Sequence, residues 1–112
     1  MRTFEKQAAQ GDFLITKIDE LPEGLEAEKP EAGQHIIAHS ETGHNHTMRA
    51  NDVQLFNEPS NPFVCYLMVD RAGTIEHQRS FDTHEAILVN PGIYRINRQR
   101  EYTPEGYRRA AD

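Results

Sequence analysis

The sequence predicts an all-β fold, namely a small single-domain β-barrel or sandwich of about seven or eight short strands. Segments rich in apolar and β-branched residues recur at a spacing of roughly ten residues, with Pro and Gly between them. No stretch shows a long helical period, and no repeat or linker divides the chain. A length of 112 residues suits one domain with one hydrophobic core.

The N-terminal part predicts two strands separated by a long loop. Residues 1–10 show no clear period, so we expect them to fray or to form a short helix. The first strand is predicted over residues 12–18, which are mostly apolar or β-branched. Residues 19–34 are rich in Glu and are interrupted by Pro and Gly, which indicates a solvated loop. Residues 35–39 form the next candidate strand.

The middle of the chain predicts shorter strands around a central apolar one. Residues 46–50 and 52–56 are either one kinked strand or two strands. Residues 63–69 are apolar at every position, as expected for a strand covered on both faces. Residues 70–73 are turn formers, and we expect them to connect this strand in a hairpin to residues 74–78.

The C-terminal part predicts two more strands and a tail. Residues 84–89 precede an Asn-Pro-Gly turn, and residues 93–100 form the last strand. Alternation along that strand places two sets on opposite sides: Tyr94, Ile96, Arg98 and Arg100 on one, and Ile93, Arg95, Asn97 and Gln99 on the other. Residues 103–112 are expected to be a C-terminal tail.

Composition and charge indicate which classes of partner are disfavoured and in which compartment we expect the protein. The net charge is −6, and residues 1–60 carry eleven carboxylates against five Lys or Arg, which disfavours nucleic acid as a partner. No apolar run approaches the roughly 20 residues that a membrane-spanning helix needs. The first residues do not resemble a secretion signal, so we expect no membrane partner and a cytoplasmic location. Cys65 lies alone inside an apolar segment and is expected to pack in the core.

Two histidines in the stretch SETGHNHT are the strongest chemical signal. On an extended strand, the side chains of His44 and His46 start about 6.6 Å apart on one face. They can therefore converge on one ion, since zinc-to-nitrogen bonds measure about 2.0–2.1 Å. A third ligand must come from elsewhere, and His84 is the candidate because it begins another strand. The sequence predicts a site for a divalent transition metal (Zn, Ni, Mn or Fe) or for a small ligand.

Other polar residues complete this predicted site. Glu41 or Gln99 would fill the remaining shell, while Arg100 or Tyr102 would contact an anionic or planar ligand. The alternative for the C-terminal stretch is an edge strand whose charges discourage pairing with another molecule. For His35, His39 and His77 we expect surface or hydrogen-bonded roles, although residues 35 and 39 have the spacing of one strand face.

Two resemblances accompany these residues. A His-x-His pair on a strand, with a later histidine on another strand, is similar in architecture and ligand type to the cupins, which hold a metal in the mouth of a small barrel. The segments TGHNH, HEAI, PGIY and QREYTP resemble a family of short uncharacterised proteins of bacteria and their phages. That resemblance covers most of the chain from Gln10 onward and implies a single domain without an assigned activity.

Three functions are compatible with the sequence. The first is a metal-binding or small-ligand-binding protein with a histidine-lined pocket, which an open metal position would make an enzyme. The second is a metal-independent phosphodiesterase or nuclease in which histidines act as acid and base. The third is a non-catalytic interaction or accessory module, phage-derived or forming a homodimer through an exposed strand.

Overall fold

The computed structural model describes residues 2–10, 13–39, 45–77, 86–98, 100–103 and 106–109 of the chain. These residues form β-strands and connecting segments, and none of them forms a helix, so the predicted all-β class is confirmed. Within the same residues there is consequently no helix with the length and apolar character that a membrane crossing requires. The strands are β1 (Gln7–Gln10), β2 (Phe13–Ile18), β3 (Glu26–Ala27), β4 (Gln34–Ala38), β5 (His46–Arg49), β6 (Val53–Asn57), β7 (Val64–Val69), β8 (Gly73–His77), β9 (Ile87–Val89), β10 (Gly92–Arg98), β11 (Arg100–Thr103) and β12 (Gly106–Arg109).

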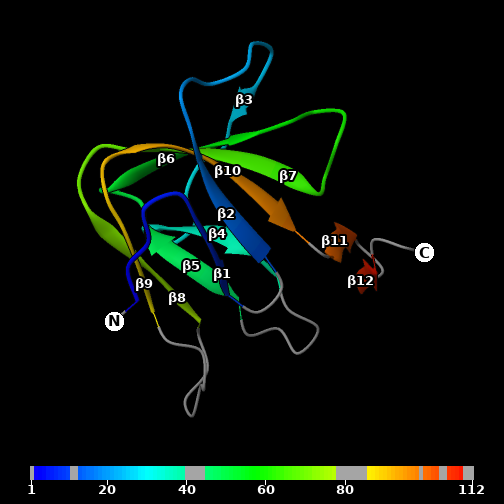
Figure 1. The fold of residues 1–112 in the computed structure, drawn as a ribbon. Coiled ribbons are helices and arrows are strands. Elements are labelled where there is room, and N and C mark those ends of the chain that lie inside the picture. The colour runs from blue at the N-terminus through cyan, green and yellow to red at the C-terminus, as the bar shows by residue number, and fades with distance from the viewer. Residues whose placement is uncertain are drawn as a thin grey trace.

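Two antiparallel sheets pack as a sandwich (Figure 1). The larger sheet has six strands in the order β1-β2-β10-β7-β6-β3, and the smaller has four in the order β4-β5-β8-β9. Strands β11 and β12 form a separate hairpin. Several of the twelve strands contain only two to four residues, so the structure divides the chain more finely than the sequence pattern does.

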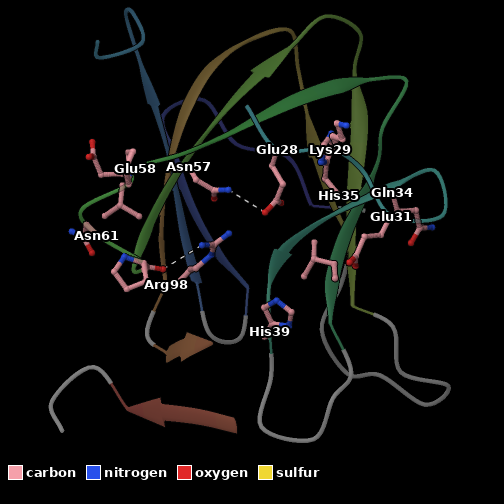
Figure 2. A pocket seen from close by; sticks show the side chains of 14 residues that line it. Glu28, Lys29, Glu31, Gln34, His35, His39, Asn57, Glu58, Asn61 and Arg98 are labelled. Carbon is pink, nitrogen blue, oxygen red and sulfur yellow. Dashed lines mark hydrogen bonds between the residues drawn. The ribbon is translucent and has the colours of Figure 1, made fainter. Parts of the chain in front are cut away.

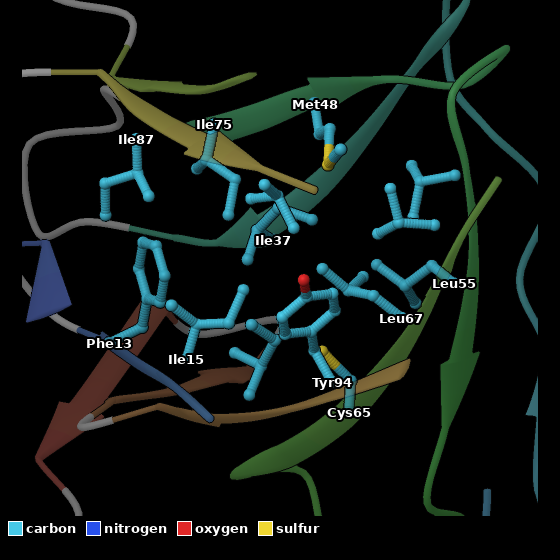
Figure 3. Packing of buried hydrophobic residues seen from close by; sticks show 14 of the residues in the cluster. Phe13, Ile15, Ile37, Met48, Leu55, Cys65, Leu67, Ile75, Ile87 and Tyr94 are labelled. Atoms are coloured by element: carbon cyan, nitrogen blue, oxygen red, sulfur yellow. The ribbon is translucent and has the colours of Figure 1, made fainter. Parts of the chain in front are cut away.

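The core lies between the two sheets and draws on both (Figure 3). In most strands alternate residues point inward, and burial of their apolar surface stabilises the sandwich by roughly 25 cal/mol per Å². In β4 the alternation is interrupted by a register shift, and the adjacent Ile37 and Ala38 are both buried. The larger sheet contributes Ala8, Phe13, Ile15, Val53, Leu55, Cys65, Leu67, Val69, Tyr94 and Ile96, and the smaller contributes Ile37, Ala38, Met48, Ile75, Ile87 and Val89. Cys65 has the predicted packing role, and burial raises the pKa of its thiol to about 11.

The N-terminal residues belong to both sheets instead of fraying or forming a helix. Arg2 makes a parallel bridge with Ile87 of β9, with hydrogen bonds to the backbone of residues 86 and 88. The chain then crosses to the larger sheet, where β1 pairs with β2. The guanidinium of Arg2 donates to the carbonyl of Ala9 at 2.5 Å, which ties the two parts of this segment together.

The predicted hairpin after β7 does not form. Strand β7 is already paired on one side with β6 and on the other with β10, so neither edge is available to β8. The chain crosses at Asp70 to the smaller sheet, where β8 pairs with β5 and β9. Residues 46–57 likewise form two strands in different sheets, β5 and β6.

The alternation predicted for the last strand is confirmed, but the strand ends earlier than predicted. Tyr94 and Ile96 of β10 are buried between the sheets, whereas Arg95 is exposed on the outer face. Strand β10 ends at Arg98, and the backbone resumes a strand at Arg100. Residues 106–109, predicted as part of a tail, form β12 and pair with β11.

Candidate ligand-binding site

A cavity of about 830 Å³ opens between the two sheets (Figure 2). Strand β4 forms one wall, and the ends of β6, β7 and β10 with the β6–β7 connection form the opposite wall. The segment after β3 adds charged side chains at the rim. The cavity is lined by Glu28, Lys29, Glu31, Gln34, His35, Ile36, His39, Asn57, Glu58, Pro59, Asn61, Pro62, Val64 and Arg98.

Arg98 bridges the two sheets at one end of this cavity. Its Nε donates to the carbonyl oxygen of Ile37 on β4 at 2.8 Å, and one Nη1 hydrogen points to the carbonyl oxygen of Pro62 at 3.3 Å. Both acceptors are neutral backbone groups, so neither of them offsets the positive charge of the guanidinium. A guanidinium has five N–H donors, and these two bonds fix its orientation. The Cys65 thiol is a further hydrogen-bond partner, and the donors that remain are available to a ligand.

His35 lines the cavity and is 4% exposed. Its Nδ1 is inaccessible to solvent and has no hydrogen-bond partner among the described residues. Burial lowers the pKa of His35, and the nearby Glu28 partly opposes that shift, so the ring is neutral at pH 7. A buried polar atom without a partner costs stability, which makes this ring the least satisfied group of the site.

His39 follows β4 and also lines the cavity. Burial and then the charge of Arg98 lower its pKa, while Glu28, Glu31 and a side-chain hydrogen bond with Asn45 act in the opposite direction. The imidazole and the guanidinium therefore lie close enough to influence each other electrically. Together they form an electropositive end of the cavity when His39 is protonated.

Carboxylates and amides occupy the remainder of the lining. Glu28 accepts a hydrogen bond from the side-chain amide of Asn57 at 3.0 Å, and Glu58 accepts one from the Ser60 hydroxyl at 3.0 Å. Glu31 is exposed, and no hydrogen bond or ion pair of its carboxylate is found among the described residues. The site thus combines fixed donors, fixed acceptors and charges of both signs.

His46 belongs to a separate buried cluster with Gln10 and Phe13. Its Nδ1 lies 2.8 Å from the Gln10 side-chain oxygen, and its ring meets Phe13 edge to face at a centroid distance of 5.1 Å. The Gln10 amide nitrogen donates to the carbonyl of Ile75 at 3.3 Å, so the amide oxygen of Gln10 is the atom that faces His46. Because that oxygen only accepts, Nδ1 carries the proton, and the lone pair of the neutral ring lies on Nε2.

The structure places only part of the site predicted from sequence. His44, His84, Glu41 and Gln99 lie outside the described residues. Arg100 and Tyr102 belong to β11, of which the backbone alone is described. His46 is 1% exposed and is held by Gln10. Among the described residues, no three His, Cys, Asp or Glu side chains form a group that could hold a metal ion.

Sequence reasoning missed the cavity's own histidines. The spacing of His35 and His39 on one strand face was the available signal, but nothing local showed that this face opens on a cavity. Arg98 was assigned to the same side as Tyr94 and Ile96, and that parity is the one that faces inward. Arg95, which the alternation put on the same side as Gln99, lies on the exposed face.

Comparison with known proteins places this chain in a family. Residues 9–99 match the domain of unknown function DUF8820. The chain belongs to the DUF8820 family. The match to DUF8820 includes every residue that lines the cavity and also Gln10 and His46, but it ends before most of the QREYTP stretch. No curated protein and no solved structure matches the chain.

Proposed function

We propose that the protein binds a small polar molecule in the cavity between its two sheets. The observation that supports this most strongly is a buried imidazole, that of His35, which lines the cavity with an unpartnered Nδ1. A sandwich without a ligand gains nothing from such a group, because an apolar side chain of similar size would avoid the cost. Ligand binding accounts for its presence, since a small ring movement would give the imidazole a partner.

The size and lining of the cavity support the same proposal. Ligand sites commonly measure about 300–1,000 Å³ and combine apolar walls with a few oriented polar groups. Here Ile36 and Val64 supply apolar surface, while Arg98 is oriented by its two backbone acceptors. These groups come from both sheets, so a ligand would contact both layers of the fold.

A fragment screen read by two-dimensional ¹⁵N–¹H NMR tests this proposal. Binding fragments should shift the amide signals of residues 28–39 and 57–64 more than those of β1 and β9. The variant Ile36→Trp, which fills the cavity, should abolish these shifts. The matched variant Ile93→Trp, at a partly buried position that does not line the cavity, should retain them. Failure of every fragment to shift the cavity signals, or equal binding by both variants, would refute ligand binding here.

A second candidate function is metal binding through His46, with His44 and His84 as the other ligands. The supporting observation is the hydrogen bond to Gln10, because it fixes the orientation of the His46 ring and places the proton of the neutral ring on Nδ1. Metal analysis of protein purified without a histidine tag tests it. Less than about a tenth of an equivalent of any transition metal, with no increase in melting temperature on addition of zinc, nickel or manganese, would discard this candidate.

A further inference from the structure

Charges of both signs line the cavity. In Figure 2, Arg98 and His39 lie in its lower part, and the segment that carries Glu28, Lys29 and Glu31 lies above them. Burial lowers the pKa of His39, and Arg98 lowers it further while Glu28 and Glu31 raise it, so charges of both signs lie within reach of this imidazole. The lining contains three carboxylates against two permanent cations, so with neutral imidazoles it carries a net charge of −1.

The cationic end is ready to receive an anionic group. Arg98 is held by carbonyl oxygens from two different segments, so its guanidinium loses little freedom when it binds a further acceptor. No carboxylate of the described residues forms an ion pair with it. A guanidinium with donors to spare matches a carboxylate, since two parallel N–H donors can meet two oxygens.

The part of the lining from Glu28 to Glu31 carries two carboxylates against the one cation of Lys29, and this acidic end is suited to a donor of opposite charge. Glu31 is exposed at the rim, and its carboxylate has no hydrogen bond or ion pair among the described residues, while Glu28 is oriented by Asn57. An ammonium group has three donors and no acceptor, so it can satisfy carboxylates without competing with Arg98. A ligand that carries only a negative charge would be repelled by the net negative charge of the lining. A ligand that carries only a positive charge would leave the remaining donors of Arg98 without an acceptor.

We infer that the ligand is a small zwitterion of the amino acid or short peptide class. Its carboxylate binds Arg98 beside His39, and its ammonium group binds the glutamates at the rim. This inference rests on the proposed function, because it assigns the chemical class of the molecule that the cavity binds. The apolar lining residues, such as Ile36 and Val64, contact the part of the ligand between the two charges.

Matched derivatives of one molecule test this class. The probes are free amino acids and dipeptides, their N-acetyl derivatives, which lack the ammonium group, and their C-terminal amides, which lack the carboxylate. Binding to the full chain is measured by calorimetry near pH 7.5. The best free zwitterion should bind about ten- to hundredfold more tightly than either of its derivatives, since each derivative loses a charged hydrogen-bonding group.

The outcomes separate this inference from the proposed function. Preferential binding of N-acetyl derivatives, amides or uncharged fragments would overturn the zwitterion and leave ligand binding intact. Absence of binding by all three sets would overturn the zwitterion, and the fragment screen described above would decide independently whether the cavity binds any molecule.

One substitution probes the acidic end without disturbing the fold. Glu31→Gln should weaken binding of the zwitterion by about two- to fivefold, as expected for an exposed charge, and should leave the affinity of the N-acetyl derivative unchanged. Glu23→Gln removes an exposed carboxylate that does not line the cavity, and it should change neither affinity. Equal effects of the two substitutions on the zwitterion would show that only the overall charge matters, which would contradict the assigned orientation.

Discussion

Replacement of His35 by leucine should stabilise the protein while it impairs ligand binding. His35 is 4% exposed, and its Nδ1 lacks both solvent and a hydrogen-bond partner among the described residues. Leucine has a similar volume and no polar atom, so the substitution removes the unsatisfied group without a large cavity. The same change removes the polar contact that the imidazole offers to a ligand.

The expected gain follows from two opposing contributions. An unpaired buried donor or acceptor costs about 1–3 kcal/mol, and an imperfect change of shape in a packed site costs up to about 1.5 kcal/mol. The free energy of unfolding of His35→Leu should therefore exceed that of the wild type by about 1 kcal/mol. For a chain of this length, that difference corresponds to an increase of about 4 °C in melting temperature.

The gain should become larger in acid. Burial holds the pKa of His35 below its ordinary value of 6.5, so the unfolded chain binds a proton more readily than the folded one. The contribution of the neutral ring is complete above pH 6.5 and is lost as the pH falls toward the folded-state pKa. Leucine does not titrate, so the stability difference between variant and wild type should be greater at about pH 5.5 than at about pH 7.5.

Urea denaturation followed by circular dichroism at both pH values measures this effect. His35→Gln serves as the control, because it keeps a polar group in the same place and should not gain stability. A His35→Leu variant less stable than the wild type by 1 kcal/mol or more would refute the reasoning, since it would mean that the imidazole makes a favourable bond in the folded protein.

Three further outcomes are expected. Gln10→Ala should lower the free energy of unfolding by about 2–4 kcal/mol in urea denaturation, because it leaves Nδ1 of His46 buried without its acceptor; a loss below 0.5 kcal/mol would contradict that role. Arg98→Lys should cost about 1–3 kcal/mol and weaken carboxylate probes in calorimetry, because an ammonium cannot span the two carbonyl acceptors that the guanidinium contacts. Wild-type stability should decline as the pH falls below 6.5, since burial lowers the pKa of both His35 and His39; a melting temperature that rises from pH 7 to pH 5 would exclude this linkage.

Local sequence pattern accounts for much of the fold. The alternation in β10 placed Tyr94 and Ile96 on one side of the strand, and the structure buries that side. The apolar segment that became β7 lies at the centre of the larger sheet. The local pattern does not predict which strands belong to which sheet. Whether β8 pairs with β7 or with β5 depends on which edges other strands already occupy, and those strands lie far apart in the chain.

The candidate site was harder to predict for the same reason. The His-x-His spacing drew attention to His46, but its hydrogen bond comes from Gln10, 36 residues earlier in the chain. The cavity depends on the approach of Arg98 to β4 from the opposite sheet, a contact across 61 positions. Neither hydrogen bond can be recognised from a short sequence motif, because each forms only when one sheet packs on the other.

The crossing of residues 2–10 between the sheets has a practical consequence for handling the protein. This segment closes one side of the sandwich, since Arg2 bonds beside β9 and β1 extends the sheet that contains β2. Removal of residues 1–10 would therefore expose the edges of β2 and β9 at once and favour self-association. An affinity tag placed directly before Arg2 needs a flexible spacer, so that Arg2 can still form its hydrogen bonds beside β9.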